Sequence, residues 1–425
     1  MEINVQDVYP DSNVVENTQD IQNAVEQLYQ NGGGTLYWQA GIYNISSIEI
    51  KSNVTFYLDA GAKIQFTDDA STFPVVYSRW EGVNRDMYRA CIYSKNAHNI
   101  EITGNGTIDG AGAKWWQDFR NKSISYPRPF LISLEDSHDI KITGITLTNS
   151  PAWTIHPLNS FHIEINGIYI KNPVDSPNTD GIDPDSSRDI RITNCLIDDG
   201  DDCIAIKSGT ENSTNLAPSQ DIFITNNIFA HGHGGVVLGS EMSGSIHNIV
   251  ISDNIMQETD RGIRLKTRRG RGGNISHIVA NNLIMDKVIT PFAFNTFYGK
   301  SGGTQNNYLS EEAQPITELT PSVNNISMNN IIVTNALSTA TFIKGLPEQP
   351  ITNMTLANIS ITMADNDQKY EPEMVDNINK YAQAGLIIEG TKNLVLNNFN
   401  VNNIKGQLWL NQNNNINLVG NAQQN

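Results

Sequence analysis

A short pattern of polar and apolar residues recurs along the chain. A polar residue, often Asn, Asp or His, is followed by an apolar, a variable and a second apolar residue, as in HDIKITGITL, FHIEINGIYI and QDIFITNNIF. The apolar residues alternate and are mostly β-branched, which predicts short strands rather than helical turns. In each copy, a turn that contains Asn or Gly joins this strand to a second short strand.

The copies are spaced almost regularly. Their first apolar residues lie at positions 100, 140, 163, 190, 222, 249, 278, 326, 354 and 394, so the central spacings are 27, 32, 27 and 29 residues. A period of this length is typical of a solenoid, in which equivalent strands of successive coils stack in parallel. Asn tolerates the left-handed backbone that each corner needs. We therefore predict an all-β protein, a right-handed parallel β-helix.

The two ends depart from the repeat. The segment NTQDIQNAVEQLYQNGGGTLYW predicts a short amphipathic helix with Asn17 or Thr18 as its N-cap and glycines at its end. Such a helix suits a cap over the open end of the core, in residues 1–45. The polar tail, residues 411–425, is expected to fray. Since no Pro- or Ser-rich linker divides the chain, we predict a single domain over residues 1–425.

Composition narrows the possible partners and compartments. The net charge of −17 argues against nucleic acid, which needs a basic face, and no apolar run reaches the roughly 18 residues of a membrane span. The N-terminal segment shows no signal peptide, and three cysteines cannot form a disulfide framework. We expect a cytoplasmic protein. A secreted or periplasmic protein whose signal peptide was removed is the alternative, and the oligomeric state is open.

Candidate chemistry follows the register of the repeat. The segment DDGDDCIAIK contains Asp201, which lies 11 residues after Ile190, and His233 of AHGHGG lies 11 residues after Ile222. Asp201 and His233 are therefore predicted to occupy the same place on successive coils. Because parallel strands lie about 4.8 Å apart, groups at such places come within reach of one hydrogen bond or one water.

Neighbouring coils add more charged groups to this stripe. Asp180 in NTDGID precedes Asp201 by 21 residues, and Arg264 and Lys266 in GIRLK share one face of a strand because they are two residues apart. When Asp180, Asp201 and Asp202 lie close together, full ionisation of all three carboxyl groups is unfavourable. One of them then stays protonated as an acid while another is ionised as a base. Glycoside hydrolysis requires such a pair, and the two cations would bind an anionic sugar.

The four segments NTDGID, GDDCIAI, GHG and RLK, in this order and spacing, resemble the signature motifs of the polygalacturonase family of glycoside hydrolases, the family 28 pectinases. Leu265 stands where many members have Ile. The resemblance covers residues 10 to 410 approximately and suggests a bacterial, exo-acting member. It implies a pectin-lyase-like solenoid and inverting hydrolysis of α-1,4-galacturonosidic bonds in homogalacturonan or oligogalacturonides, acidic saccharides that are its only implied partners, without a metal or cofactor.

The resemblance also implies a role for each matched residue. These roles are Asp201 as general acid, Asp180 and Asp202 as the groups that hold and activate water, His233 as a group that tunes the acid, and Arg264 with Lys266 as ligands of a galacturonate carboxylate.

Further residues are candidates for substrate binding, each with a structural alternative. Asn178 lies in the first motif and is equally well explained as a turn former. For the aromatic candidates the alternative is burial in the core. The candidates outside the motifs are Trp153 and His156 in NSPAWTIHP, Tyr298 in NTFYGK, and Arg79 and Trp80 in the long loop SRWEGVNRDMY. Arg268, Arg269 and Arg271 are either a solvated loop or ligands of further acidic sugars.

Several rival functions stay open at this point. The long loop near residue 80 interrupts the repeat and favours exo action by closing one end of a groove, whereas an open groove would give an endo-polygalacturonase. Rhamnogalacturonan or xylogalacturonan hydrolysis is an alternative within the family. A calcium-dependent pectate lyase and a non-catalytic carbohydrate-binding β-helix are alternatives outside it.

Overall fold

The computed structural model describes residues 1–299, 308–375, 378–413, 416–417 and 422–424. It contains two compact units, Met1–Asp201 and Asp202–Asn425. Within each unit, short parallel strands follow one another in coils. The predicted fold class, an all-β right-handed parallel β-helix, is confirmed.

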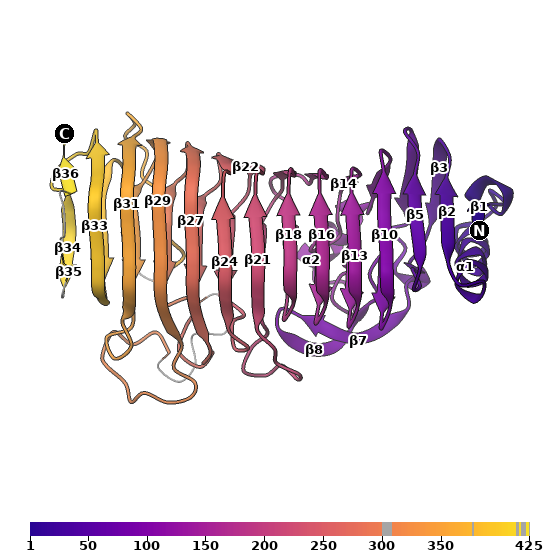
Figure 1. Ribbon diagram of the computed structural model, residues 1–425, viewed down its shortest axis with the longest axis horizontal. Helices are drawn as coiled ribbons and strands as arrows, with labels where there is room; N and C mark the ends of the chain where they lie inside the picture. The colour runs from indigo at the N-terminus through magenta and orange to yellow at the C-terminus, as the bar shows by residue number, and fades with distance from the viewer. Residues whose placement is uncertain (300–307, 376–377, 414–415, 418–421, 425) are drawn as a thin grey trace. The chain divides into compact units, whose positions relative to one another are not determined.

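The first unit has three rows of stacked parallel strands, and strands of the first row stand side by side in Figure 1. The first row is β1 (Glu2–Asn4), β2 (Gly34–Trp38), β5 (Val54–Leu58), β10 (His98–Gly104), β13 (His138–Thr143), β16 (Phe161–Asn166) and β18 (Arg188–Thr193). The second row is β3 (Gly41–Ile45), β6 (Ala62–Phe66), β11 (Thr107–Asp109), β14 (Thr146–Thr148), β17 (Tyr169–Lys171) and β19 (Leu196–Asp198). The third row is β4 (Ile48–Glu49), β9 (Ile92–Lys95), β12 (Ile132–Glu135) and β15 (Ile155–Leu158).

The register of the first row is the one that the repeat predicts. Ile100 pairs with Ile140, Ile140 with Ile163, and Ile163 with Ile190. All four side chains are at most 1% exposed, so they form a continuous apolar column inside the coils. Stacking identical β-branched residues in this way removes each of them from water and stabilises neighbouring coils against one another.

The polar residue before each isoleucine has a backbone role. Asn99, Asp139, His162 and Asp189 have φ between 52° and 55°, in the left-handed region. Asn and Asp tolerate this region because their short side chains bond locally. The repeated polar residue therefore marks a bend of the backbone.

Helix α1 (Val14–Gln30) covers the first strands of this unit. Its N-cap is Asn13, whose side chain accepts hydrogen bonds from the N–H groups of Val15 and Glu16, so the predicted caps Asn17 and Thr18 were wrong. Both lie inside the helix, and each bonds the backbone of the segment 44–46. The helix thereby satisfies backbone groups at the edge of the sheet, which would otherwise invite another strand.

The long loop near residue 80 is an antiparallel hairpin of β7 (Val75–Trp80) and β8 (Val83–Tyr88). Its strands run across the direction of the stacked strands (Figure 1). Helix α2 (Gly112–Arg120) is a second insertion, and two short 3₁₀ helices cover Val5–Asp7 and Ala70–Thr72. Departures from the repeat therefore form ordered additions to the coils.

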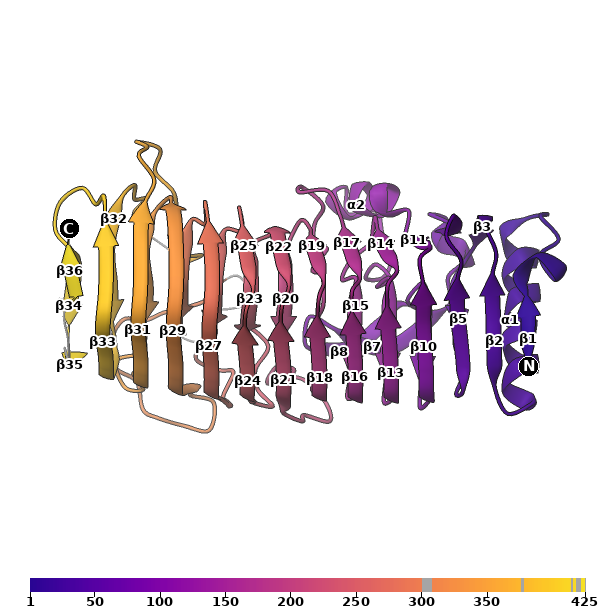
Figure 2. The ribbon, with the colours of Figure 1, turned by 45° about the horizontal axis from the view of Figure 1, so that its top comes forward.

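The second unit continues the same plan with longer strands (Figure 2). One row holds β21 (Ser219–Thr225), β24 (Ile246–Ser252), β27 (Asn274–Asp286), β29 (Ser322–Ala336), β31 (Ile351–Met363), β33 (Thr391–Asn402), β35 (Ile416–Asn417) and β36 (Ala422–Gln424), with β22 (Ile228–His231) and β25 (Ile255–Gln257) beside the first two. The other row is β20 (Asp202–Ile206), β23 (Gly234–Gly239), β26 (Arg261–Lys266), β28 (Thr290–Asn295), β30 (Thr339–Lys344), β32 (Ala384–Glu389) and β34 (Trp409–Asn413).

The second unit keeps the predicted register with one difference. Its apolar column runs through Ile222, Ile249, Ile278, Ile326, Met354 and Leu394. From β27 onward, the predicted pair of strands is one continuous strand, in which Asn282, Asn330, Asn358 or Asn398 supplies a left-handed bend. The tail predicted to fray lies partly outside the described residues, and β35 and β36 pair with β33.

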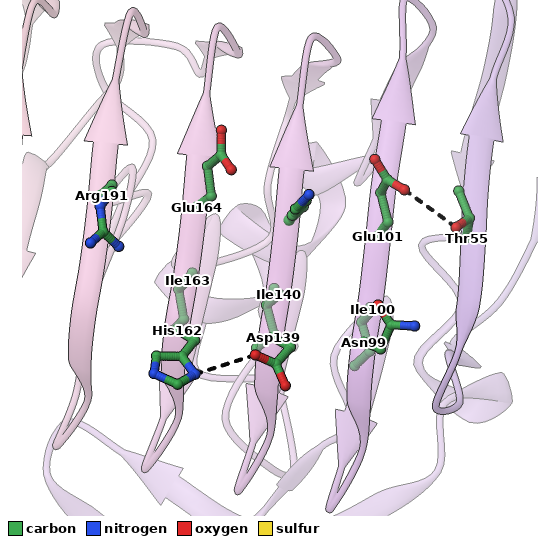
Figure 3. Close-up of a pocket in the computed structure, with 11 residues that line it drawn as sticks. Thr55, Asn99, Ile100, Glu101, Asp139, Ile140, His162, Ile163, Glu164 and Arg191 are labelled. Carbon is green, nitrogen blue, oxygen red and sulfur yellow. Dashed lines mark hydrogen bonds and ion pairs between the residues drawn. The ribbon is translucent and has the colours of Figure 1, made fainter.

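The outer face of the first unit carries a shallow groove (Figure 3). Glu101, Lys141, Glu164 and Arg191 form one row across it, because their strands pair in this register. Opposite charges thus alternate from coil to coil, an arrangement that supports stacked strands. The groove is lined by strands of the first row, whereas the candidate acids described below lie elsewhere.

Candidate active site

The first unit positions Asp180 through backbone hydrogen bonds. Thr154 donates its N–H to the Asp180 carbonyl at 2.8 Å, and Ile155 donates to the Gly181 carbonyl at 3.1 Å. Ile155 also forms a parallel bridge with Ile182. The segment around Asp180 therefore extends the third row beyond β15, and the Asp180 side chain is buried in it.

Asp201 follows a turn in which glycine is required. A Cβ atom at Gly200 would lie 2.5 Å from the Ser176 carbonyl oxygen, so the turn packs too closely for any side chain. This packing leaves a carboxylate oxygen of the half-buried Asp201 within 4.8 Å of one on Asp180. Two carboxyl groups this close can supply the acid and the base that hydrolysis of a glycosidic bond needs.

Arg128 is a functional candidate that the sequence reasoning missed. Its side chain is 1% exposed and donates to the Asn178 side chain at 2.6 Å and to the Pro151 and Pro177 carbonyls at 2.7 Å. Burial lowers the pKa of Arg128 to about 10, although neighbouring carboxylates, Asp180 and Asp201 among them, favour the charged form. Arg128 therefore supplies positive charge beside the acid pair.

Asn178 has the backbone geometry expected of a turn former. Its φ of 54° is left-handed, and its side-chain oxygen accepts the hydrogen bond from Arg128. Substrate contact by Asn178 stays a prediction.

Three predicted aromatic or imidazole ligands lie in a packed cluster. Trp80, Phe130 and Trp153 stack with centroid distances of 4.9 to 5.9 Å, and His156 meets Phe130 and Trp153 edge-on. Trp80 is 8%, Trp153 2% and His156 0% exposed. The structure therefore gives these side chains the core position that was their alternative. Sugar contacts through them stay a prediction.

Arg79 is in a buried ion pair. Its Nη1 lies 2.8 Å from Asp185 Oδ1 and 2.8 Å from the Ser186 hydroxyl, and Arg79 is 1% exposed. Burial alone would raise the pKa of Asp185, but the charge of Arg79 and the neighbouring His156 lower it to about 2. Arg79 thus anchors the β7–β8 hairpin to the coils, and its contact with a sugar stays a prediction.

The second unit holds Asp202 between two cations. Lys266 Nζ lies 2.6 Å from Asp202 Oδ2, and Arg264 Nη1 lies 3.3 Å from Oδ1. Burial would raise the pKa of Asp202, but the charges of Lys266 and Arg264 outweigh it and hold this pKa well below its usual value. Asp202 therefore stays ionised at working pH and suits the role of a base or water ligand.

The strand register places His233 at the start of β23. Asp202 pairs with Gly234, the residue after His233, across β20 and β23. A Cβ at Gly234 would lie 3.2 Å from Asp202 Oδ1 and 2.5 Å from a Val237 methyl group, so the glycine leaves room for this carboxylate. The bridge between Gly232 and Thr259 brings Asp260 to the next equivalent position, where it pairs with Arg261.

A glutamate distant in sequence completes this ion-pair network. Glu373 accepts hydrogen bonds from Arg264 Nε at 2.9 Å and from Nη2 at 2.6 Å, and it is 0% exposed. The predicted ligand Tyr298 lies beside both cations, with its ring centroid 5.8 Å from Arg264 Cζ and 5.4 Å from Lys266 Nζ. The structure thus brings together Asp202, Arg264, Lys266 and Tyr298.

The arginines after Lys266 are structural. Arg268 and Arg271 both pair with Glu211, and Arg269 pairs with Glu348. All three arginines are buried. They therefore do not form a solvated loop, and contact with further acidic sugars stays a prediction.

Comparison with known proteins decides the family. Residues 39–383 match the sequence profile of Glycosyl hydrolases family 28. The chain belongs to this family. It is therefore a glycoside hydrolase, as predicted.

Relatives include plant and bacterial enzymes. A probable polygalacturonase of Vitis vinifera is 36% identical over 366 residues, which are 83% of this chain and 72% of that protein. An endo-polygalacturonase of Pectobacterium carotovorum subsp. carotovorum is 30% identical over 304 residues, 68% of this chain and 73% of that protein. Among solved structures, a hyperthermoactive exopolygalacturonase of Thermotoga maritima has 26% identity and a TM-score of 0.76, over 93% of this chain and 92% of that one.

Among the residues that the structure describes, no helix has the length and apolar character needed to cross a membrane. Cys91, Cys195 and Cys203 are buried thiols.

Proposed function

We propose that this family 28 enzyme hydrolyses the α-1,4-galacturonosidic bonds of homogalacturonan or oligogalacturonides. The observation that carries the proposal is the carboxylate pair of Asp180 and Asp201, with oxygens within 4.8 Å, in the segments that match the family motifs. Polygalacturonases of both exo and endo type among the relatives support the same substrate class.

The proposed reaction assigns one proton to each step. Protonated Asp201 donates its proton to the glycosidic oxygen while the bond from that oxygen to the anomeric carbon breaks. Water attacks the anomeric carbon from the opposite side and gives a proton to ionised Asp180 or Asp202, and His233 tunes the acid. Asp202 suits the base role because Lys266 and Arg264 keep it ionised.

Release of reducing sugar from polygalacturonate tests this proposal. We expect the activity to be unchanged in excess EDTA, which removes calcium. This test is needed because a pair of carboxylates can also bind a cation, and a calcium-dependent lyase would lose its activity without calcium. A product with an unsaturated, ultraviolet-absorbing end would indicate the lyase. Inactivity on polygalacturonate together with cleavage of a rhamnose- or xylose-decorated galacturonan would move the substrate within the family.

We further propose exo action, on the basis of the β7–β8 hairpin. Trp80 at its tip lies with its ring centroid 5.9 Å from Arg128 Cζ, and Arg128 binds Asn178 beside the acid pair. The carboxylate of Glu81, the next residue of the tip, favours the charged form of Arg128. The hairpin therefore ends near Asp180. There it would close one end of a substrate-binding groove beside the acids and admit only a chain end. Arg85 of the hairpin is exposed and would suit an acidic terminal sugar.

Products at early times distinguish exo from endo action. With polygalacturonate we expect galacturonate from the first time points, because a wall beside the acids leaves space for a terminal sugar only. Chromatography of the products together with viscometry checks this. An early ladder of mixed oligomers with a rapid fall in viscosity would indicate an open groove and an endo-polygalacturonase.

Inversion at the anomeric carbon is expected. Water that attacks opposite the departing α-linked sugar produces the β-anomer first, and proton NMR of freshly cleaved product detects it before mutarotation. If the α-anomer came first, Asp180 and Asp202 would not act as the base for an attacking water.

Lys266→Ala is expected to raise KM about tenfold or more. A lost charge-assisted contact with a carboxylate costs roughly 1.5 to 3 kcal/mol, and Lys266 is less buried than Arg264. Steady-state kinetics on a defined oligogalacturonide measures this, with Lys287→Ala as a control, since Lys287 pairs with Glu258 at the surface. An unchanged KM with a lower kcat would restrict Lys266 to holding Asp202.

We also propose that the enzyme acts in the cytoplasm. Its buried thiols agree with a reducing compartment.

A further inference from the structure

Glu373 lies in an insertion of the second unit. The apolar column is spaced by 28 residues from 326 to 354 but by 40 residues from 354 to 394. The extra residues fall between β31 and β32, and they contain Glu373. A fully buried carboxylate in an inserted segment requires a partner that offsets the loss of water.

Glu373 binds Arg264, which it shares with Asp202, and its carboxylate also lies 3.8 Å from Arg261 Nε. Nε and Nη2 of Arg264 form the two-bond fork to Glu373, and Nη1 reaches Asp202 Oδ1. Arg264 is 1% exposed, so its guanidinium is held inside the protein by these two carboxylates. The three side chains form a continuous chain in the order Glu373, Arg264, Asp202.

The backbone next to Glu373 is fixed by the strands beneath it. Arg261 donates from Nε to the Pro372 carbonyl at 3.3 Å and from Nη2 to the Glu371 carbonyl at 3.1 Å. Asn295 of β28 donates to the Met374 carbonyl at 3.4 Å. Carbonyls on both sides of Glu373 are therefore bound, and its carboxylate is presented to Arg264 in a set position.

The fork to Glu373 limits how Arg264 meets Asp202. Lys266 binds Oδ2 of Asp202, and Arg264 reaches Oδ1 through Nη1 alone. If Arg264 lost its fork to Glu373, its planar donors would turn to a two-bond contact with Asp202, the nearest anion. The orientation of the Asp202 carboxylate would then change.

We propose that Glu373 is a positioning residue that holds Arg264 and, through it, orients the Asp202 carboxylate for its role as a base. This inference rests on the proposed function, in which Asp202 takes part as a base. It makes the insertion between β31 and β32 part of the catalytic support.

Glu373→Gln tests the inference by separating kcat from KM. The amide keeps the shape of the side chain but lacks the charge that holds the guanidinium. We expect kcat to fall about 10- to 100-fold, less than the 10² to 10⁴ that a general acid or base itself contributes, with KM within about threefold of wild type. The control is Glu371→Gln on the same segment, whose exposed carboxylate pairs with Lys380 at 3.5 Å. It should keep wild-type kcat and KM.

A double-mutant cycle asks whether Glu373 acts through Arg264. We expect Glu373→Gln to change kcat less than about threefold when Arg264→Gln is already present, because the charge to be held is gone. Multiplied losses in the double variant, a loss of kcat below about tenfold in Glu373→Gln, or an effect mainly on KM would each overturn the inference.

Separate controls distinguish a loss of folding, and a failure of the proposed function, from the role of Glu373. All rates are expressed per mole of folded protein, from thermal unfolding of each variant. If Glu373→Gln does not fold, Glu373→Asp keeps the charge with a shorter reach, and we expect a lower kcat at unchanged KM. A wild-type kcat in Glu373→Asp would then overturn the inference. The wild-type assay on polygalacturonate decides the proposed function, and the ratio of variant to wild type decides the role of Glu373.

Discussion

Asp201→Asn is expected to lower kcat by about 10² to 10⁴-fold while the fold stays intact. A carboxamide has almost the shape of the carboxyl group, and Asp201 is half-buried beside Asp180. It cannot donate the proton that the departing glycosidic oxygen needs, and a general acid contributes about this factor. Steady-state kinetics on polygalacturonate gives kcat, and circular dichroism with thermal unfolding shows whether the fold is kept.

Asp198→Asn is the matched control for this variant. Asp198 is the last residue of β19, three positions before Asp201, and it pairs in register with Lys171. The same loss of one negative charge near the same turn should leave kcat close to wild type. More than about a tenth of wild-type activity in Asp201→Asn would remove Asp201 from the role of general acid.

The stacking of coils was predictable from the sequence because the fold repeats it. Ile222, Ile249 and Ile278 pair as their spacing predicts, since each buried position is marked again in every coil. The same regularity placed Asp202 opposite Gly234. A one-residue shift would turn the whole apolar column toward solvent, so the hydrophobic pattern alone fixes this register.

The partners of the charged residues were not predictable, because they come from segments outside the repeat. Arg128 reaches Asn178, 50 residues away, and Arg264 reaches Glu373, 109 residues away. Sequence spacing carries no signal for contacts made by insertions. The long interval before residue 394 marked where an insertion lies, but not which of its side chains turns inward.

The sequence-based predictions differ from the structure mainly in the burial of individual polar side chains. The sequence predicts either a solvated loop or ligands of acidic sugars for Arg268, Arg269 and Arg271. Each of these arginines instead has a glutamate partner inside the protein. The helix cap shows the same limitation on a local scale. Asn13, Asn17 and Thr18 all have suitable side chains for an N-cap, and tertiary contacts with the segment 44–46 decided which residues lie inside the helix.

Arg79→Met is expected to destabilise the first unit by about 3 to 5 kcal/mol. Arg79 and Asp185 are at most 1% exposed, and their ion pair joins the β7–β8 hairpin to the coils at 2.8 Å. Removing one partner leaves the Asp185 carboxylate buried without the cation that balances it, which costs about this much. Denaturant unfolding measures the change, with Arg85→Met as the control, since Arg85 is exposed on the same hairpin.

The pH dependence of this loss identifies its electrostatic cause. In the wild type, the pKa of Asp185 is about 2, below the value of roughly 3.9 expected in the unfolded chain. The ion pair therefore stabilises the fold above about pH 4, and this contribution is lost as the pH falls toward 2.

In Arg79→Met, burial without the cation raises the pKa of Asp185 above its unfolded value. The destabilisation is therefore present at neutral pH and is relieved when the carboxylate is protonated. The difference in unfolding free energy between wild type and variant should thus be largest near pH 7. It should shrink as the pH falls through the raised pKa of the variant and continue to shrink toward pH 2. A difference that is constant from pH 7 to pH 3 would show that Arg79 stabilises the hairpin by packing alone.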